Sequence, residues 1–267
     1  MKFIAAAVQM VASDDKAANL NEAERWVRQA AGQGARVVAL PEVFIWRGNK
    51  NEERSAAETI PGPSSELLAA LARELGIYFL AGSILEEISG SPKAYNTSLL
   101  FDPAGKLLAS YRKIHLFDVD LANGVSLRES NTRAHGAAVV SAETEFGVMG
   151  LSVCYDLRFP ELYRGLANKG ANIIFVPSAF TAFTGQAHWE TLLRARAIEN
   201  QVFMIAPDQF GKAPKSFETH GHSVIIDPWG KVLAELADGP GVVLAEIDLD
   251  YLAKVRADLP SLQHRRL

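Results

Sequence analysis

Short apolar runs alternate with longer amphipathic stretches along almost the whole chain, and this alternation constrains the fold most strongly. The apolar runs predict strands at residues 3–10, 36–40, 77–85, 96–101, 106–115, 137–141, 147–154, 172–177, 202–206, 223–226, 232–235 and 242–247. Helical periodicity predicts helices at residues 19–31, 63–75, 160–169, 189–199 and 251–259. Strands separated by helices are typical of an α/β protein. A turn at 227–230 predicts a hairpin, so the sheets are expected to be mixed.

Composition and charge exclude several classes of protein. Lys and Arg total 27 against 31 Asp and Glu, a formal charge of −4, so no basic excess is available to bind nucleic acid or an anionic membrane. The first apolar run ends at Gln9, too early for a signal peptide. No run reaches the roughly 18 apolar residues of a membrane span. Because no linker or low-complexity segment interrupts the chain, residues 1–267 are expected to form a single domain.

The single cysteine, Cys154, is a candidate nucleophile. It cannot form a disulfide within the chain, and a free thiol fits a reducing, cytoplasmic compartment. It lies at the end of a predicted strand, where α/β folds usually place functional residues. The segment 155–161 that follows is polar and charged, unlike the surroundings of an inert core thiol, which is the alternative interpretation.

A cysteine nucleophile needs a base and a group that stabilises the oxyanion. None of His115, His188 and His222 has a telling spacing to the cysteine. Glu42 follows a predicted strand and could take the thiol proton. Lys113, at the end of another extended segment, could stabilise the oxyanion together with a backbone N–H after the cysteine. The alternative is that the glutamate is an ordinary loop carboxylate and the lysine a surface charge.

Three ordered segments resemble the signature segments of the nitrilase, or carbon–nitrogen hydrolase, superfamily. They are Leu-Pro-Glu at 40–42, Tyr-Arg-Lys-Ile-His-Leu-Phe at 111–117 and Cys-Tyr-Asp-Leu-Arg-Phe-Pro-Glu at 154–161. The key residues of successive segments lie 71 and 41 positions apart, which is typical of the superfamily. The similarity covers nearly the whole chain.

This resemblance implies a four-layer αββα sandwich with mixed sheets and a cofactor-free hydrolase without a metal. Cys154 would be the nucleophile, Glu42 the general base, and Lys113 the group that stabilises the tetrahedral intermediate. Glu129, after the lysine segment, would orient the lysine and assist proton transfer. The thiol would attack an amide carbon, ammonia would leave after protonation by the glutamate, and water would hydrolyse the thioester.

The residues after the nucleophile resemble the amidase branch, because true nitrilases usually have Cys-Trp-Glu there. This branch includes amidases of deaminated glutathione and omega-amidases, and segments 194–199 and 263–266 resemble the former more closely. Deaminated glutathione is therefore the expected substrate. The alternatives are α-ketoglutaramate, or a binding protein that keeps the fold without turnover. The segment 207–219 does not resemble the corresponding segment of this branch.

Both substrates carry an α-keto acid, so a cation near the thiol is expected. Arg158 is the candidate, since a guanidinium binds a carboxylate through two hydrogen bonds; the alternative is an ion pair with Asp156 or Glu161. The other residues expected at the substrate are Tyr155, next to the nucleophile, and, on the loop after strand 172–177, Phe180 and Thr184.

Two further expectations concern partners. Family resemblance suggests a homodimer or a higher homo-oligomer, with the helices on the cysteine side and the C-terminal tail at the contact. His220 and His222 have a spacing that could bind a metal, but no third ligand is evident, so a structural role is expected.

Overall fold

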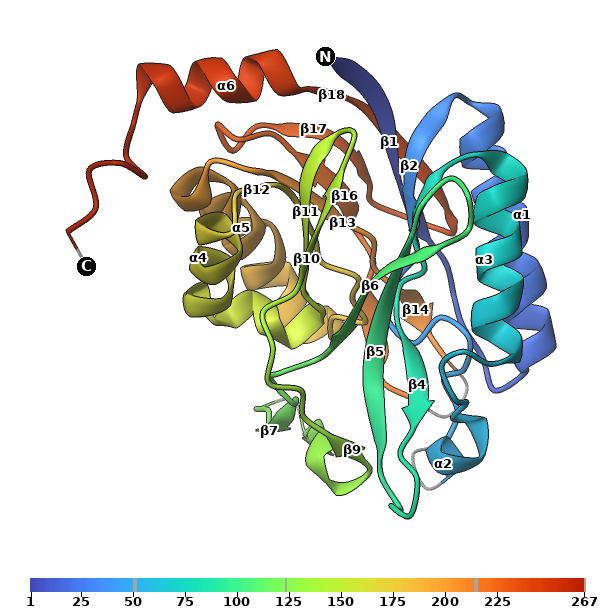
Figure 1. Ribbon diagram of the computed structural model, residues 1–267. Coiled ribbons are helices and arrows are strands. Elements are labelled where there is room, and N and C mark those ends of the chain that lie inside the picture. Colours follow the sequence, from blue (N-terminus) through green and yellow to red (C-terminus); the bar gives the residue numbers. More distant parts are fainter. Residues whose placement is uncertain (50–51, 123, 214–215, 267) are drawn as a thin grey trace.

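The computed structural model describes residues 1–49, 52–122, 124–213 and 216–266. Two sheets pack face to face, and helices cover the outer side of each, which gives the four layers expected for an αββα sandwich (Figure 1). The helices on the first sheet are α1 (Lys16–Gly32) and α3 (Pro63–Leu75). The helices on the second are α4 (Pro160–Asn168) and α5 (Ala182–Asn200).

The first sheet has, within the described residues, the order β18-β1-β2-β3-β5-β4, with β6 and β9 also paired to β5. Its strands are β18 (Gly241–Asp248), β1 (Lys2–Gln9), β2 (Ala35–Ala39), β3 (Tyr78–Leu80), β5 (Ala94–Phe101), β4 (Ile84–Glu87), β6 (Leu107–Arg112) and β9 (Arg133–Ala134). Because β1 pairs in parallel with β2 and antiparallel with β18, the sheet is mixed, as predicted.

The second sheet has the order β10-β11-β12-β13-β16-β17. Its strands are β10 (Ser141–Thr144), β11 (Gly147–Leu151), β12 (Ala171–Phe175), β13 (Phe203–Ala206), β16 (Ser223–Ile226) and β17 (Val232–Leu236). The central three strands are parallel, and the last two form the predicted hairpin.

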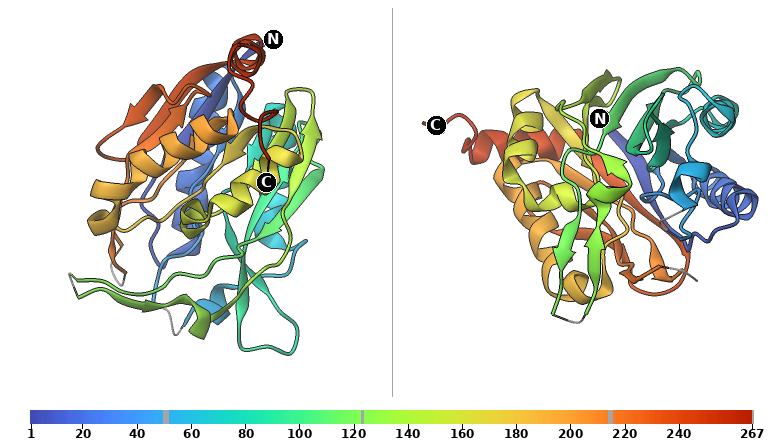
Figure 2. Two further views of the ribbon diagram at one scale, coloured as in Figure 1. Left: turned by 90° about the vertical axis from the view of Figure 1, so that its left-hand side faces the viewer. Right: turned by 90° about the horizontal axis from the view of Figure 1, so that it is seen from below.

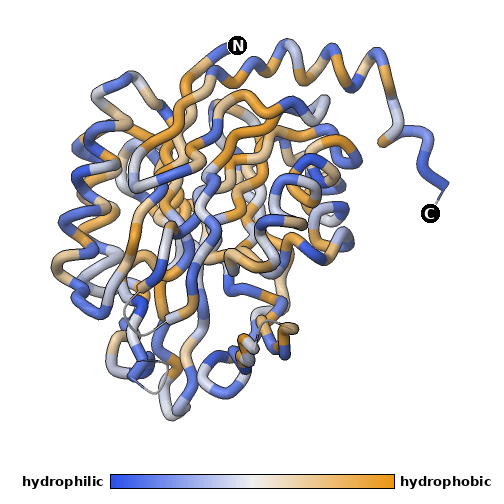
Figure 3. The backbone as a smooth tube through the Cα atoms, turned by 180° about the vertical axis from the view of Figure 1, so that it is seen from behind, coloured by the Kyte–Doolittle hydropathy of each residue, from blue (hydrophilic) through white to orange (hydrophobic). Residues whose placement is uncertain are grey.

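The continuous apolar sequence of β1 follows from its position between two cores. Ala5 and Ala7 face the core between the sheets, whereas Ala6 and Val8 face the core beneath α1 and α3. A strand buried on both faces needs apolar residues at every position rather than at alternate ones. Figure 3 shows this concentration of hydrophobic residues in the strands.

Several predicted elements need correction. The strand at 77–85 is two strands, because Gly82, with φ of 45°, breaks the extended backbone between β3 and β4. Residues 137–140 are not a strand, and β10 begins at Ser141. The strand at 147–154 ends at Leu151. The helix at 189–199 begins earlier, at Ala182, because the side chain of Thr181 caps it.

The remaining elements lie around these layers (Figure 2). They are α2 (Glu53–Ala56), the hairpins β7 (Asp118–Asp120) with β8 (Ser126–Arg128) and β14 (Phe210–Lys212) with β15 (Glu218–His220), the 3₁₀ helices Glu129–Asn131 and Cys154–Arg158, and α6 (Leu249–Asp258). None of the described helices combines the length and apolar character that crossing a membrane requires.

Candidate active site

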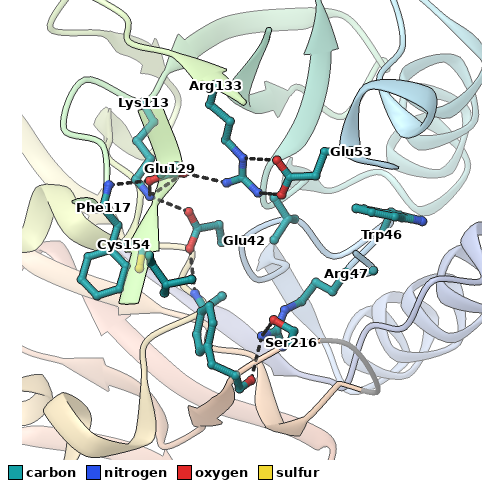
Figure 4. A pocket seen from close by; sticks show the side chains of 15 residues that line it. Glu42, Trp46, Arg47, Glu53, Lys113, Phe117, Glu129, Arg133, Cys154 and Ser216 are labelled. Atoms are coloured by element: carbon teal, nitrogen blue, oxygen red, sulfur yellow. Dashed lines mark hydrogen bonds and ion pairs between the residues drawn. The ribbon is translucent and has the colours of Figure 1, made fainter. Parts of the chain in front are cut away.

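Residues far apart in the sequence meet at one end of the sandwich because several strands end there (Figure 4). Glu42 follows β2, and Lys113 follows β6 of the same sheet. Cys154 follows β11 of the opposite sheet. All three side chains line one cavity, so the structure brings together the residues that the sequence singled out.

Cys154 has a backbone conformation that is unusual for a residue with a side chain. It begins a 3₁₀ helix with φ of 48°, and its N–H donates to the Pro177 carbonyl at 3.0 Å. Such left-handed conformations are disfavoured in non-glycine residues and concentrate at functional sites. The turn places the thiol at the cavity wall although the residue is 92% buried, with 8% of its surface exposed.

Every oxygen of the Glu42 carboxylate is held by a donor. Oε1 accepts from Lys113 Nζ at 2.8 Å and from Asn96 Nδ2 at 2.7 Å. Oε2 accepts from the N–H of Ala179 at 2.9 Å. The side chain is buried, and so these contacts fix the carboxylate beside the thiol rather than leaving it to solvent.

Lys113 is a buried cation between two carboxylates. Besides Glu42, its Nζ donates to both oxygens of Glu129, at 3.0 and 3.2 Å. Burial alone would lower the pKa of Lys113, but the Glu129 and Glu42 carboxylates raise it above its usual value. The ammonium therefore stays charged at neutral pH and is held in place.

Glu129 is itself fixed by three groups. It accepts from the Phe117 N–H at 2.6 Å and from Arg133 Nη1 at 2.6 Å, in addition to Lys113. Burial opposes the charged form, but Lys113 and Arg133 hold the pKa of this carboxyl well below its usual value. Arg133 continues the network to Glu53 through an ion pair of 2.6 Å.

Sequence reasoning missed this extension to Arg133 and Glu53. The spacing of Glu129 and Arg133, four residues apart, was an available signal. No sequence signal pointed to Glu53, because it lies in α2 and is 80 residues away from Arg133 in the chain.

The electrostatics favour a neutral thiol at rest. Burial raises the pKa of Cys154 well above its usual value, and the negative charge of Glu42 raises it further, against the opposing effect of Lys113. A buried thiol of this kind becomes a nucleophile when a neighbouring base removes its proton. The Glu42 carboxylate lines the same cavity as the thiol.

Two compartments meet at the thiol. Counting space that opens to solvent, the main compartment holds about 540 Å³ and the small compartment about 210 Å³. Cys154, Phe117 and Ala179 line both. The main compartment is further lined by Glu42, Val43, Trp46, Arg47, Gly48, Glu53, Lys113, Leu127, Glu129, Arg133, Ser216 and Phe217. The small compartment is further lined by Tyr155, Arg158, Phe180, Thr181 and Thr184.

The four residues expected at the substrate thus lie together in the small compartment. The Arg158 guanidinium lies over the rings of Tyr155 and Phe180, at 5.7 and 5.2 Å, and Nη1 contacts His188 Nδ1 at 3.1 Å. Thr184 lies in the first turn of α5 rather than on a loop, and its hydroxyl contacts that of Thr181 at 2.7 Å.

The alternative role for Arg158 is wrong, because the structure records no ion pair between it and either predicted carboxylate. Asp156 instead accepts from the Tyr111 hydroxyl at 2.7 Å and from the His115 N–H at 3.1 Å. This leaves the guanidinium at the cavity wall.

The main compartment contains one cation that the sequence gave no reason to select. Arg47 comes from the loop after β2, and its Nη2 donates to Ser216 Oγ at 3.2 Å and to the Phe217 carbonyl at 3.4 Å. Ser216 and Phe217 belong to the segment 207–219, which the sequence marked as individual to this chain. Positions 214 and 215 of that segment lie outside the described residues.

His220 and His222 form a separate cluster. Their rings stack with centroids 4.3 Å apart, and His222 Nδ1 contacts Glu235 Oε1 at 2.5 Å. Within the described ranges, no group of three or more His, Cys, Asp or Glu is arranged to hold a metal ion.

Known proteins resemble this chain over its whole length. The sequence profile of the carbon-nitrogen hydrolase family matches residues 4–257. A deaminated glutathione amidase of Synechocystis sp. (strain PCC 6803 / GT-S) is 46% identical over 266 residues, 98% of each chain. The omega-amidase NIT2 of Danio rerio is 43% identical over 265 residues, 99% of this chain and 95% of the relative.

Solved structures agree with this similarity. Saccharomyces cerevisiae Nit3, described as a member of branch 10 of the nitrilase superfamily, has a TM-score of 0.90 at 34% identity and covers 100% of this chain and 97% of its own. A mutant amidase from Nesterenkonia sp. AN1 has a TM-score of 0.81 at 27% identity, over 96% of this chain and 95% of its own. Its active-site cysteine carries the covalently added acetamide moiety of fluoroacetamide.

Proposed function

The chain belongs to the carbon–nitrogen hydrolase family and is an amidase, and we propose that its substrate is deaminated glutathione. The observation that carries the reaction is the contact of Lys113 with both Glu42 and Glu129 beside a buried thiol. The substrate assignment is supported by the 46% identity to a relative named for that activity.

In the first half of the proposed reaction, Cys154 attacks the amide carbon while Glu42 takes the thiol proton. The carbonyl oxygen becomes an oxyanion, which the Lys113 ammonium and the N–H of Tyr155 stabilise. Glu42 then gives the proton to the amide nitrogen, the C–N bond breaks, and the amine departs. The acyl group remains on sulfur as a thioester.

In the second half, Glu42 takes a proton from water as the water oxygen attacks the thioester carbon. The same two donors stabilise the second oxyanion. The C–S bond then breaks, the acid departs, and the proton returns to the Cys154 sulfur. The role of Glu129 is to hold Lys113 charged and in position, and its fixed contacts with Phe117 and Arg133 support that role.

The acyl part of the proposed substrate is an α-ketoglutaryl group. Its carboxylate would bind Arg158, whose guanidinium has no carboxylate partner within the described residues. Tyr155 and Phe180 would pack against the chain, and Thr184 would offer a hydroxyl. The departing amine is cysteinylglycine for deaminated glutathione and ammonia for α-ketoglutaramate, because the amide nitrogen belongs to a cysteinyl residue in the former.

The test is release of α-ketoglutarate from deaminated glutathione and α-ketoglutaramate, with ammonia release from glutamine and an aliphatic nitrile for comparison. We expect the highest kcat/KM with deaminated glutathione and no turnover by Cys154→Ala. A clear preference for α-ketoglutaramate would replace the proposed substrate by the second candidate. Turnover of none of them by the wild-type protein would favour a binding protein without catalytic activity.

We also propose a homodimer. Phe183 and Ile198 on α5 are about half exposed, at 50% and 48%, as is Trp229 at 58%, and a pair contact would cover such apolar residues. Light scattering should give twice the chain mass for the wild type and the single mass for Ile198→Glu. Because the proposed nucleophile must stay reduced, we place the enzyme in the cytoplasm.

A further inference from the structure

Each of the two compartments is lined by one arginine that has no carboxylate partner among the described residues. Among the described lining residues, Lys113 and Arg133 are neutralised by ion pairs with Glu42, Glu129 and Glu53. Arg158 in the small compartment and Arg47 in the main compartment form no such pair. A buried cation without a counterion is costly, and a bound anion would remove that cost.

Arg47 is oriented by several contacts but not satisfied. Its side chain is buried, and its guanidinium lies 5.3 Å from the Phe217 ring centroid. Nη2 has the two acceptors on Ser216 and Phe217, whereas Nη1 is buried and has no hydrogen-bond partner. In Figure 4 the side chain extends along the wall of the cavity that also holds Glu42 and Cys154. The Nη1 amino group of the guanidinium is thus left without an acceptor, which a ligand could supply.

The charge of Arg47 is retained at neutral pH. Burial lowers the pKa of this guanidinium to about 10, with Asp208 and Glu42 opposing the decrease. Asp208 does not neutralise it, because the two form no ion pair and burial raises the pKa of that carboxyl well above its usual value. The main compartment therefore presents a positive charge at Arg47.

The position of Glu42 decides which part of the substrate enters each compartment. In the proposed reaction this residue protonates the departing nitrogen, and it lines the main compartment. The departing amine must then lie in the main compartment, and the acyl chain extends toward Arg158 in the small compartment. The main compartment, which has the larger volume, thus receives cysteinylglycine, which is the larger of the two fragments of deaminated glutathione.

We propose that Arg47 binds the carboxylate of the departing peptide and so selects amides whose amine part ends in an acid. This inference rests on the proposed function. In deaminated glutathione the carboxylate belongs to the glycine, two residues and up to about 7 Å along an extended chain from the scissile nitrogen. α-Ketoglutaramate has no such group. Arg47 is thus a specificity-determining residue, distinct in location from the acyl-side Arg158.

The experiment pairs a change in the substrate with a change in the enzyme. Deaminated glutathione is compared with its C-terminal glycinamide, in which the carboxylate is capped, by α-ketoglutarate release. For the wild type we expect capping to reduce kcat/KM by about 10- to 100-fold, mainly through KM, as for loss of a charged hydrogen bond. For Arg47→Met we expect the two substrates to differ by less than about 2-fold, because the interaction is already absent.

Two variants complete the design. Arg47→Lys keeps the charge without the planar group and should restore part of the discrimination. Arg73→Met removes an exposed arginine of α3 and should discriminate as the wild type does.

Three other results of this experiment would contradict the proposal. Equal turnover of both substrates by the wild type would overturn the role of Arg47 while leaving the amidase activity in place, and this comparison does not depend on any variant folding. Discrimination that persists in Arg47→Met would assign the carboxylate to another residue. Release of α-ketoglutarate from neither deaminated glutathione nor α-ketoglutaramate would instead overturn the proposed function and this inference with it.

Discussion

Lys113 Nζ lies 2.8 Å from Glu42 Oε1, although the residues are 71 positions apart and follow different strands. Both side chains are almost completely buried, at 2% and 3% exposure. Burying two charges gives little net stability, because loss of hydration offsets most of the attraction. The proposed reaction gives the pair a different purpose, because it needs the carboxylate beside the thiol and the ammonium near the developing oxyanion.

Substitution of Cys154 by alanine should abolish turnover and leave the fold intact. The thiol supplies the bond-forming electron pair, so we expect kcat to fall by at least about 10³-fold. Deaminated glutathione turnover and a thermal melt would be measured on the same preparation. Activity within 10-fold of the wild type would exclude the thiol as the nucleophile.

Glu42→Gln should lower kcat by about 10²- to 10⁴-fold, since the general base is lost. It should also lower the pKa of Cys154, because the Glu42 charge raises it. Alkylation of the thiol by iodoacetamide, measured against pH, should therefore begin at lower pH in the variant. The matched control is Glu66→Gln, at an exposed position of α3, which should not change the pH dependence of alkylation. An unshifted profile in Glu42→Gln would contradict the electrostatic coupling.

Glu129→Gln should destabilise the protein by about 3–5 kcal/mol at neutral pH, since it leaves Lys113 and Arg133 with an unpaired share of buried charge. Burial opposes ionisation of Glu129, but the two cations lower its folded-state pKa. Its contribution to stability is thus present above the unfolded-state pKa of about 4.5 and is lost as pH falls toward the folded-state pKa. Urea unfolding of both proteins should show the difference shrinking below about pH 4.5. A constant difference down to pH 3 would refute the assignment.

Arg158→Met should raise KM for deaminated glutathione and α-ketoglutaramate by a similar factor of about 10 or more, because both share the α-ketoglutaryl carboxylate. Steady-state kinetics on the two substrates measure this directly. A loss confined to deaminated glutathione would place Arg158 on the departing-amine side and reverse the assignment of the compartments.

Gly82→Ala should disturb the strand end that carries Glu42. A Cβ at this position would lie 2.0 Å from the Pro41 carbonyl oxygen, and its φ is 45°. We expect a loss of about 2–4 kcal/mol together with reduced kcat. Gly90→Ala is the control, since φ is 71° but no atom lies within 4 Å; it should cost about 1 kcal/mol and leave kcat unchanged. Equal effects of the two substitutions would exclude the steric explanation.

The sequence predicted the layers and singled out candidate residues that line one cavity, because both depend on local patterns. Apolar runs of five or six residues marked β2 and β12. Glu42 was marked because it follows one such run, and Cys154 because it ends the predicted strand at 147–154. The end of the extended segment 106–115 marked Lys113, and the resemblance to the carbon–nitrogen hydrolase superfamily added Glu129. These signals lie within short stretches of chain, so they can be recognised without the fold.

What the sequence could not predict depends on contacts across long distances in the chain. Arg47 resembles an ordinary loop arginine until Ser216, 169 residues later, holds it against the cavity. The helix that carries Thr184 begins at Ala182, seven residues before its predicted start at 189, because the Thr181 side chain caps it there. The hairpin β7–β8 consists of two three-residue strands, too short for a pattern.

The groups of the proposed reaction follow strands of both sheets of the sandwich, with Glu42 and Lys113 on one and Cys154 on the other. Near the site the two sheets are joined by hydrogen bonds, such as that of the Ala179 N–H to Glu42, and elsewhere their spacing depends on the side chains packed between them. The distance between the Cys154 thiol and the Glu42 carboxylate therefore depends on how closely the two sheets pack against each other. Mild heat, or a substitution that leaves a cavity at Ala5 or Phe175, should weaken the packing between the sheets. Such a change should abolish the activity while circular dichroism still reports intact strands and helices.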